Sequence, residues 1–280
     1  MTPPDLYRIR DFVPDFDAVA AEFAARSRAV SDKARLLADR RYGSGLRECV
    51  DILLPPQPRT GAPLHVFVHG GYWRSGEKEN YRLVAAPVLE AGGIAAIVEY
   101  DLMPAARLSV LVDQVRRAVL WLQARAAEFG ADPSRLTVSG HSAGAHLASF
   151  LAATGPLEQE APPLPAVRSL LLVSGIYDLS GIPDSFLKNE AGMTPAEAAA
   201  WSPLTADQRA GPARIVAFGA EETTPFHEQA AALAGKLDAQ GQPAELLPVA
   251  GLNHMNVVLD LSDPAGRLGR RLADMVASSG

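Results

Sequence analysis

The sequence predicts an α/β protein with a mostly parallel central sheet and helices on both of its faces. Two observations lead to this fold class. Short runs rich in Val, Ile and Leu alternate with longer helical patterns from about residue 48 to the C-terminus. The short runs are apolar almost throughout, which is typical of strands buried on both faces of a parallel sheet. Strands that alternate with helices form doubly wound sheets with right-handed crossovers.

Seven runs are the candidate strands, and each is bounded by Gly, Pro or Asp. They span residues 48–54, 64–69, 94–100, 135–139, 169–174, 213–219 and 244–249. The helical patterns between them cover residues 108–129, 145–153, 226–240 and 263–278. In the first of these, apolar side chains recur at helical spacing along one face, which predicts a helix packed against the sheet. They are Leu111, Val115, Ala118, Val119 and Leu122.

Two segments fall outside this alternation. Residues 1–45 form a predicted N-terminal helical extension, since apolar residues recur at helical spacing before the first strand. These residues are Phe16, Val19, Ala20 and Phe23, with Leu36 and Leu37 later. Residues 176–212 connect two strands and are rich in Pro, Gly and Ala. Either segment is a lid over the C-terminal edge of the sheet or a packing extension, because long connections inside compact domains are often functional. The main domain is expected at 46–280.

Composition narrows the classes of function. The chain has 280 residues, 48% of them hydrophobic, and a formal net charge of -6. This balance argues against a nucleic-acid binder or a polybasic membrane anchor. Cys49 is the single cysteine, so no intramolecular disulfide is expected, and its place in a candidate strand predicts a buried thiol. No signal peptide or membrane span is recognisable, and a cytoplasmic protein is expected.

The strongest motif is Gly140-His141-Ser142-Ala143-Gly144, the only G-x-S-x-G in the chain. A candidate strand precedes it and a candidate helix follows, which is the context of the nucleophile elbow in α/β hydrolases. A tight strand-to-helix turn would hold Ser142 in a strained conformation with its hydroxyl exposed at the sheet edge. The alternative is an ordinary Gly-rich turn. The motif predicts an α/β-hydrolase fold with Ser142 as nucleophile.

A serine hydroxyl needs a general base, and six histidines are available. Only His254 follows the last candidate strand in a loop, at the edge where Ser142 must also lie. We therefore predict His254 as the base. The supporting carboxylate should lie between Ser142 and His254, after a strand. The segment after residues 213–219 offers Glu222, which we prefer, and Glu221 as its alternative, with Asp178 a third candidate.

A tetrahedral intermediate needs amide donors for its negative oxygen. His69-Gly70-Gly71-Tyr72-Trp73 follows a candidate strand, as the HGGG-type loop of lipases and esterases does. We predict an oxyanion hole from the amides of Gly70, Gly71 and Ala143. The alternative is a turn that only ends the strand. No His-Glu-x-x-His motif, Cys cluster or Gly-rich phosphate loop is present, so neither a metal nor a cofactor is expected.

Taken together, these motifs resemble the kynurenine formamidase (arylformamidase) branch of the hormone-sensitive-lipase-like α/β hydrolases, from about residue 45 to the end. The matching motifs are residues 69–73, Ser75-Gly76, Tyr100-Asp101 with Pro104, 140–146, 174–179, 202–204 and 218–229. The family's acid lies four residues before a Phe, and counting back from Phe226 gives Glu222. The best-known members have Asp at this position, and here it would be Glu.

The resemblance implies hydrolysis of an N-formyl arylamide, such as N-formylkynurenine, to formate and the free amine. Tyr72, Trp73 and Tyr177 are predicted to line an aromatic-friendly pocket, and Phe186 belongs either to the pocket or to the core. One alternative is a short-acyl carboxylesterase, or a hydrolase of a small amide or carbamate, with the same triad. Another is a non-catalytic ligand-binding protein on a hydrolase fold. The expected partner is a small-molecule ester or amide, and the sequence leaves open whether the chain forms a homodimer.

Overall fold

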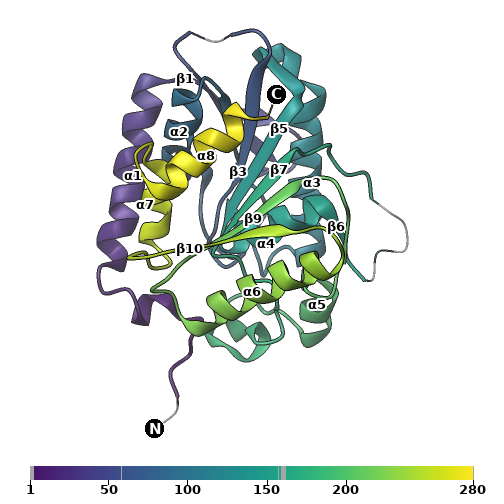
Figure 1. The fold of residues 1–280 in the computed structure, drawn as a ribbon. Helices are drawn as coiled ribbons and strands as arrows, with labels where there is room; N and C mark the ends of the chain where they lie inside the picture. Colours follow the sequence, from purple (N-terminus) through teal and green to yellow (C-terminus); the bar gives the residue numbers. More distant parts are fainter. Residues whose placement is uncertain (1–2, 58, 157, 159–161, 280) are drawn as a thin grey trace.

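The computed structural model describes residues 3–57, 59–156, 158 and 162–279, and Figure 1 shows its fold. Its centre is an eight-stranded sheet in the order β1-β2-β4-β3-β5-β7-β9-β10. β2 runs antiparallel to both of its neighbours, and the other adjacent strands are parallel. The strands are β1 (Arg35–Arg41), β2 (Cys49–Leu54), β3 (Ala62–Val68), β4 (Ile94–Val98), β5 (Ala131–His141), β7 (Ser169–Val173), β9 (Ala213–Gly219) and β10 (Ala244–Val249). The predicted mostly parallel sheet is confirmed.

Helices cover both faces of this sheet. Figure 1 shows α1, α2, α7 and α8 on one side, and α3, α4 and α6 on the other. The α-helices are α1 (Phe16–Lys33), α2 (Ala85–Glu90), α3 (Leu108–Ala124), α4 (Ala143–Ser149), α5 (Pro195–Ala200), α6 (Thr224–Ala239), α7 (Asn256–Ser262) and α8 (Arg267–Ala277). Short 3-10 helices are η1 (Ile9–Asp11), η2 (Lys78–Val84), η3 (Ala126–Phe129), η4 (Phe150–Ala152), η5 (Ile182–Asp184) and η6 (Phe186–Lys188). β6 (Ala153–Thr154) and β8 (Asp207–Gln208) pair in a separate two-stranded sheet.

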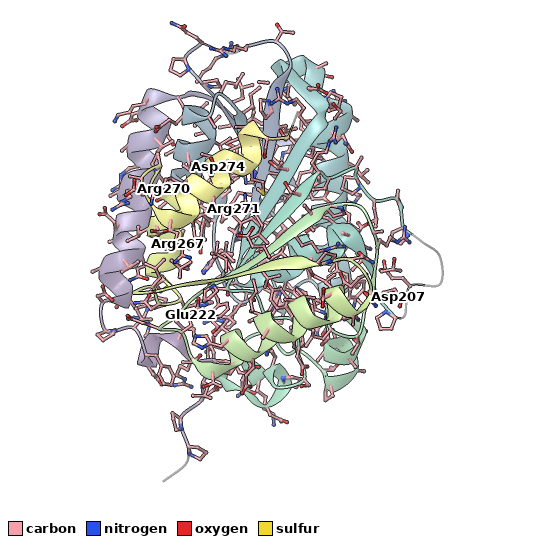
Figure 2. The ribbon with its side chains drawn as sticks, viewed as in Figure 1. Asp207, Glu222, Arg267, Arg270, Arg271 and Asp274 are labelled. Carbon is pink, nitrogen blue, oxygen red and sulfur yellow. The ribbon has the colours of Figure 1, made fainter. Side chains whose placement is uncertain are left out.

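Burial follows the apolar patterns of the sequence. Every residue of β3 and of β4 is buried, as expected for central strands covered on both faces. In α3 the predicted apolar face is completely buried. α8 shows the same division, because its apolar side is buried while charged side chains lie on its outer side. Figure 2 shows these charged residues, which are Arg267, Arg270, Arg271 and Asp274. Cys49 lies buried in β2, as predicted.

The N-terminal extension is helical only in part, and this corrects the prediction for residues 1–45, of which residues 1–2 lie outside the described range. α1 contains the expected apolar positions, but Leu36 and Leu37 lie in β1, where they pair antiparallel with Leu53 and Ile52 of β2. β1 is the edge strand, and most of its residues are exposed and charged. Its sequence therefore lacks the apolar run of a buried strand, and pairing with β2 determines its structure.

Residues 5–8 and the connection 176–212 lie beside the C-terminal ends of the strands. The carbonyl of Leu6 accepts a hydrogen bond from Thr223 Oγ1 at 2.7 Å, just after β9. A carboxylate oxygen of Asp5 accepts a hydrogen bond from the Phe186 amide at 2.5 Å. These contacts bring two segments far apart in the sequence to one edge of the sheet. In the described part of the chain, no helix combines the length and apolarity needed to cross a bilayer.

Candidate active site

Ser142 lies at a sharp turn between a central strand and a helix. β5 ends at His141 and α4 begins at Ala143, so Ser142 alone makes the turn, with φ 55° and ψ -121°. This conformation is strained for any residue with a side chain. The turn also needs its glycines, because a Cβ on Gly144 would lie 2.1 Å from the carbonyl oxygen of Val68. The sequence thus folds here into the tight elbow that the motif predicts.

His254 lies in the loop between β10 and α7 and faces Ser142. Its Nε2 is 3.0 Å from Ser142 Oγ, and its Nδ1 is 2.8 Å from Glu222 Oε2. Asn253 stabilises the loop, since its side-chain oxygen accepts hydrogen bonds from the amides of Met255 and Asn256. The side chains of Ser142, His254 and Glu222 are all buried. The structure therefore brings together the three residues that the sequence singled out.

Of the three candidate acids, only Glu222 contacts the histidine. Its other carboxylate oxygen accepts hydrogen bonds from Ser174 Oγ at 2.5 Å and from the Gly219 amide at 2.7 Å. Glu221 is exposed, and the carboxylate of Asp178 accepts a hydrogen bond from the Ser180 amide. The hydrogen bonds orient the Glu222 carboxylate toward His254 and satisfy its second oxygen. Ser174 lies in the family-like segment 174–179, but its hydrogen bond to Glu222 was not predicted from the sequence.

The loop after β3 passes directly over the elbow. A Cβ on Gly70 would lie 3.2 Å from Ser142 Cβ and 3.0 Å from the carbonyl oxygen of His141, so a side chain here would crowd the elbow. Gly71 has φ 122°, and Tyr72 and Trp73 follow with φ 50° and 60°. Within the described residues, the amides of Gly70, Gly71 and Ala143 donate no hydrogen bond to another protein group. These amides are therefore free to meet an oxygen atom above Ser142.

A buried polar network supports this loop from below, and the sequence did not reveal it. His69 Nε2 lies 2.9 Å from Glu99 Oε1, and Arg47 Nη2 donates to the same oxygen at 2.6 Å. The hydroxyl of Tyr100 donates to the carbonyl of His69 at 2.7 Å. Burial alone would raise the pKa of Glu99, but the hydrogen bond from His69 and the charges of His69 and Arg47 lower it below its ordinary value. The family-like motif Tyr100-Asp101 was the one sequence feature that pointed to this network.

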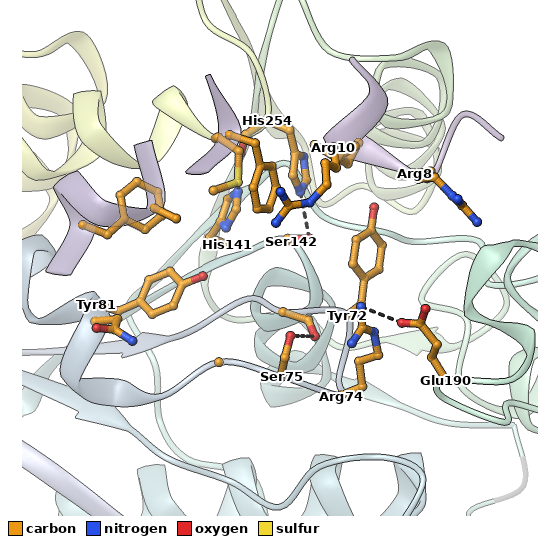
Figure 3. A pocket seen from close by; sticks show the side chains of 18 of the residues that line it. Arg8, Arg10, Tyr72, Arg74, Ser75, Tyr81, His141, Ser142, Glu190 and His254 are labelled. Atoms are coloured by element: carbon orange, nitrogen blue, oxygen red, sulfur yellow. Dashed lines mark hydrogen bonds and ion pairs between the residues drawn. The ribbon is translucent and has the colours of Figure 1, made fainter. Parts of the chain in front are cut away.

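A cavity of about 590 Å³ opens above Ser142 and His254 (Figure 3). Its walls come from the N-terminal segment, α1, the loop after β3 and residues 186–190. The lining residues are Arg8, Ile9, Arg10, Phe16, Ala20, Phe23, Ala24, Gly71, Tyr72, Arg74, Ser75, Gly76, Asn80, Tyr81, His141, Ser142, Phe186, Glu190, His254 and Met255. In the described part of the chain, no group of three or more His, Cys, Asp or Glu side chains is arranged to hold a metal ion.

Two of the three aromatic residues predicted for the pocket lie elsewhere. Tyr72 lines the cavity, whereas Trp73 and Tyr177 are completely buried and are not among its lining residues. Trp73 Nε1 donates to Nδ1 of His146 at 3.0 Å, which places its ring beneath the loop and against α4. Phe186, left between pocket and core, lines the cavity and packs edge-on against Tyr72 at 5.3 Å between ring centroids.

Comparison with known proteins agrees with this geometry. Residues 50–237 match the BD-FAE family model. Kynurenine formamidase of Salmo salar is 30% identical over 244 residues, which cover 85% of this chain and 81% of that protein. The enzyme of the same name from Danio rerio is 28% identical over 259 residues, or 91% of this chain and 85% of the relative.

A solved structure gives the same result for the fold. A candidate thioesterase from a Silicibacter species superposes with a TM-score of 0.81 at 28% identity, covering 96% of this chain and 98% of the other. The fold, the elbow and the relatives agree with one another. The chain belongs to the BD-FAE family and is a hydrolase of the kynurenine-formamidase-like branch of the α/β hydrolases.

Proposed function

We propose that this chain is a serine hydrolase that cleaves N-formyl arylamides, such as N-formylkynurenine, to formate and the free amine. The observation that carries the proposal is the continuous line of contacts from Glu222 through His254 to Ser142, at 2.8 and 3.0 Å, at the floor of a cavity. Hydroxyl, imidazole and carboxylate in this order are the parts of an acyl-transfer triad. The similarity to kynurenine formamidases supports the formyl amide as substrate.

In the first half of the reaction, Ser142 Oγ attacks the formyl carbon while His254 Nε2 takes the hydroxyl proton. The carbonyl oxygen becomes an oxyanion, and the amides of Gly70, Gly71 and Ala143 donate hydrogen bonds to it. Glu222 holds the His254 ring and stabilises its positive charge. His254 then gives the proton to the leaving nitrogen, the C–N bond breaks, and the arylamine departs from a formyl ester on Ser142.

In the second half, His254 takes a proton from water, which attacks the formyl ester. The second tetrahedral intermediate collapses, the proton returns from His254 to Ser142 Oγ, and formate is released. The same amides meet the oxyanion in both halves. The aromatic side chains of Tyr72 and Phe186 line the cavity and offer apolar surface to an aryl leaving group.

The decisive experiment measures N-formylkynurenine turnover by wild type and by Ser142→Ala, with formate release as a second readout. We expect turnover by wild type and its loss in the variant. A fluorophosphonate probe should label wild type and not Ser142→Ala. Equal labelling of the two proteins would refute Ser142 as the nucleophile, and the absence of both labelling and turnover in wild type would favour the non-catalytic ligand-binding alternative.

A short-acyl carboxylesterase is the second candidate function. The observation that favours it is the similarity to the candidate thioesterase from Silicibacter, because a thioesterase cleaves an acyl ester of a thiol and its substrate is an ester, not an amide. A panel of p-nitrophenyl esters beside N-formylkynurenine separates the two functions. Rapid ester turnover with negligible N-formylkynurenine turnover would overturn the formamidase assignment and leave the serine mechanism in place.

We also propose that the N-terminal segment and the connection 176–212 together form a cap on the main domain. Residues from both of them line the cavity, including Arg8, Phe16 and Phe186. Replacing Phe16 with Ala should therefore alter KM for aryl substrates, which is measured with the same panel. A cytoplasmic location stays a prediction, and the question of a homodimer stays open.

A further inference from the structure

The cavity above Ser142 carries an excess of positive charge, although the whole chain has a formal net charge of -6. Arg8, Arg10 and Arg74 line it, and Glu190 is the one Asp or Glu among its lining residues in the described part of the chain. A concave site lined by one sign of charge concentrates ligands of the opposite sign. The charge distribution therefore favours an anionic group on the substrate.

The three arginines differ in the partners that they already have. Arg10 pairs with Asp17 at 2.7 Å, and Arg74 pairs with Glu190 at 2.6 Å. Arg8 forms no ion pair with any carboxylate that the structure describes, and its guanidinium carbon lies 5.3 Å from the centroid of the Phe186 ring. An arginine held over an aromatic face keeps its N–H donors available for a planar anion. Among the arginines that line this cavity, Arg8 is thus the one whose N–H groups are not paired with a carboxylate that the structure describes.

The backbone that carries Arg8 is fixed in place. The hydroxyl of Tyr72 donates to the carbonyl of Tyr7, directly before Arg8. The carbonyl of Leu6 accepts a hydrogen bond from the Thr223 hydroxyl, and the Asp5 carboxylate accepts one from the amide of Phe186. These hydrogen bonds come from three places: the loop after β3, the loop that carries Glu222 and the 176–212 connection. Together they fix the position of the Arg8 Cα atom. Such preorganisation lowers the entropic cost of binding a ligand.

The Arg74–Glu190 pair lies at the same end of the cavity (Figure 3). A guanidinium and a carboxylate side by side are complementary to the carboxylate and the ammonium of an α-amino acid. Tyr72 and Phe186 lie beside them and offer the aromatic surface that an aryl group needs. Charged and aromatic contacts therefore occur together at one end of the cavity.

We propose that this end of the cavity is a subsite for a carboxylate on the leaving amine, with Arg8 as the main specificity-determining residue and the Arg74–Glu190 pair beside it. The inference rests on the proposed function and sharpens it. It assigns to Arg8 the preference for a leaving group with a charged tail over neutral esters and amides of the same size.

The test compares N-formylkynurenine with its carboxamide, in which the tail carboxylate is replaced by a neutral amide. Both substrates are assayed with wild type, with Arg8→Gln and with Arg28→Gln. Arg28 is an exposed residue of α1 outside the cavity, so its variant changes the net charge equally and serves as the matched control. In Arg8→Gln we expect KM for N-formylkynurenine to rise about tenfold with kcat unchanged, and KM for the carboxamide to stay constant.

Equal KM values for the two substrates in wild type would overturn the subsite, as would an Arg8→Gln variant that behaves like Arg28→Gln. If neither formyl compound is turned over, the proposed function fails, but the subsite is still tested. The ester pair 4-acetoxybenzoate and 4-acetoxybenzamide then makes the same comparison between a charged and a neutral leaving group. A preference for the charged ester that is lost in Arg8→Gln supports the subsite, and its absence in wild type contradicts it.

Discussion

The carboxylate of Glu99 accepts a hydrogen bond from His69 Nε2 at 2.9 Å, at a place where both side chains are buried. His69 directly precedes Gly70 and Gly71, whose amides we assign to the oxyanion hole. The other ring nitrogen of His69 lies 2.7 Å from the carbonyl oxygen of Gly70. Glu99 does not line the cavity above Ser142, so we expect it to act on the loop through His69 as a positioning residue.

Replacing Glu99 with Gln should lower kcat by about tenfold to a hundredfold and leave KM almost unchanged, because misplacing an oxyanion donor affects the transition state more than the bound substrate. Steady-state kinetics on a p-nitrophenyl ester measures this division. Glu245→Gln is the control, since Glu245 forms an exposed ion pair with Arg271. A rise in KM without a fall in kcat would show that Glu99 does not act through the oxyanion loop.

The neighbouring glutamates of the acid loop provide an internal comparison. Glu222→Gln should reduce kcat by about 10³- to 10⁴-fold, because a neutral amide no longer stabilises the positive charge that forms on His254. Glu221→Gln should retain wild-type activity, since Glu221 is exposed. Both variants are assayed on the same ester at the same pH. Similar losses in the two variants would contradict the assignment of Glu222 as the acid.

Two glycines give a matched pair for stability. A Cβ on Gly144 would lie 2.1 Å from the carbonyl oxygen of Val68, so Gly144→Ala should lower the free energy of unfolding by about 1–3 kcal/mol and abolish activity. Nothing lies within 4 Å of a Cβ on Gly235 in α6, so Gly235→Ala should raise it by about 0.5–1 kcal/mol. Urea unfolding checks both values. A stable, active Gly144→Ala protein would show that the elbow is looser than described.

Buried histidines make the stability of the fold depend on pH. Burial lowers the pKa of His65 from 6.5 to about 3 and that of His146 from 6.5 to about 4. Below pH 6.5 the unfolded chain takes up protons that these folded side chains do not. Their contribution is therefore complete above pH 6.5 and is lost as the pH falls toward 4 and 3.

We expect the free energy of unfolding to fall by about 1.4 kcal/mol per pH unit for each such histidine. His65→Gln should remove one of these contributions and lose about 2 kcal/mol less than wild type between pH 7 and pH 5. Urea unfolding at the two pH values measures the difference. Between pH 8 and pH 7 the two proteins should behave alike. The same acid sensitivity in both proteins would contradict the role of His65.

Local patterns predicted the centre of the molecule well. The apolar runs located the buried strands, since burial on both faces leaves a signal in every residue of β3. The elbow was predictable because its glycines and Ser142 are adjacent in the sequence. β1 was missed for the opposite reason. An exposed edge strand carries charged residues, and Leu36 and Leu37 alone did not distinguish a strand from a helix.

Features that depend on long-range contacts could not be predicted in the same way. Glu221 and Glu222 are neighbours, and only the fold shows which carboxylate meets His254. Trp73 was expected in the pocket as one of several aromatic residues, but three successive residues with positive φ, Gly71 to Trp73, turn the chain so that Trp73 contacts His146 under the loop. The backbone just before Arg8 is likewise held by long-range hydrogen bonds. Leu6 and Asp5 bond to Thr223 and Phe186, which lie about two hundred positions away in the sequence.

The order in which the sheet supplies the three triad side chains has a consequence for how the protein matures. Ser142 follows a central strand, Glu222 follows β9, and His254 follows β10, the last strand along the chain and an edge of the sheet. A chain that ends before β10 and the loop after it lacks the base for its serine, so we expect it to be inactive. Because His254 is positioned only when β10 lies beside β9, recovery of turnover in a refolding experiment requires that this edge of the sheet has formed.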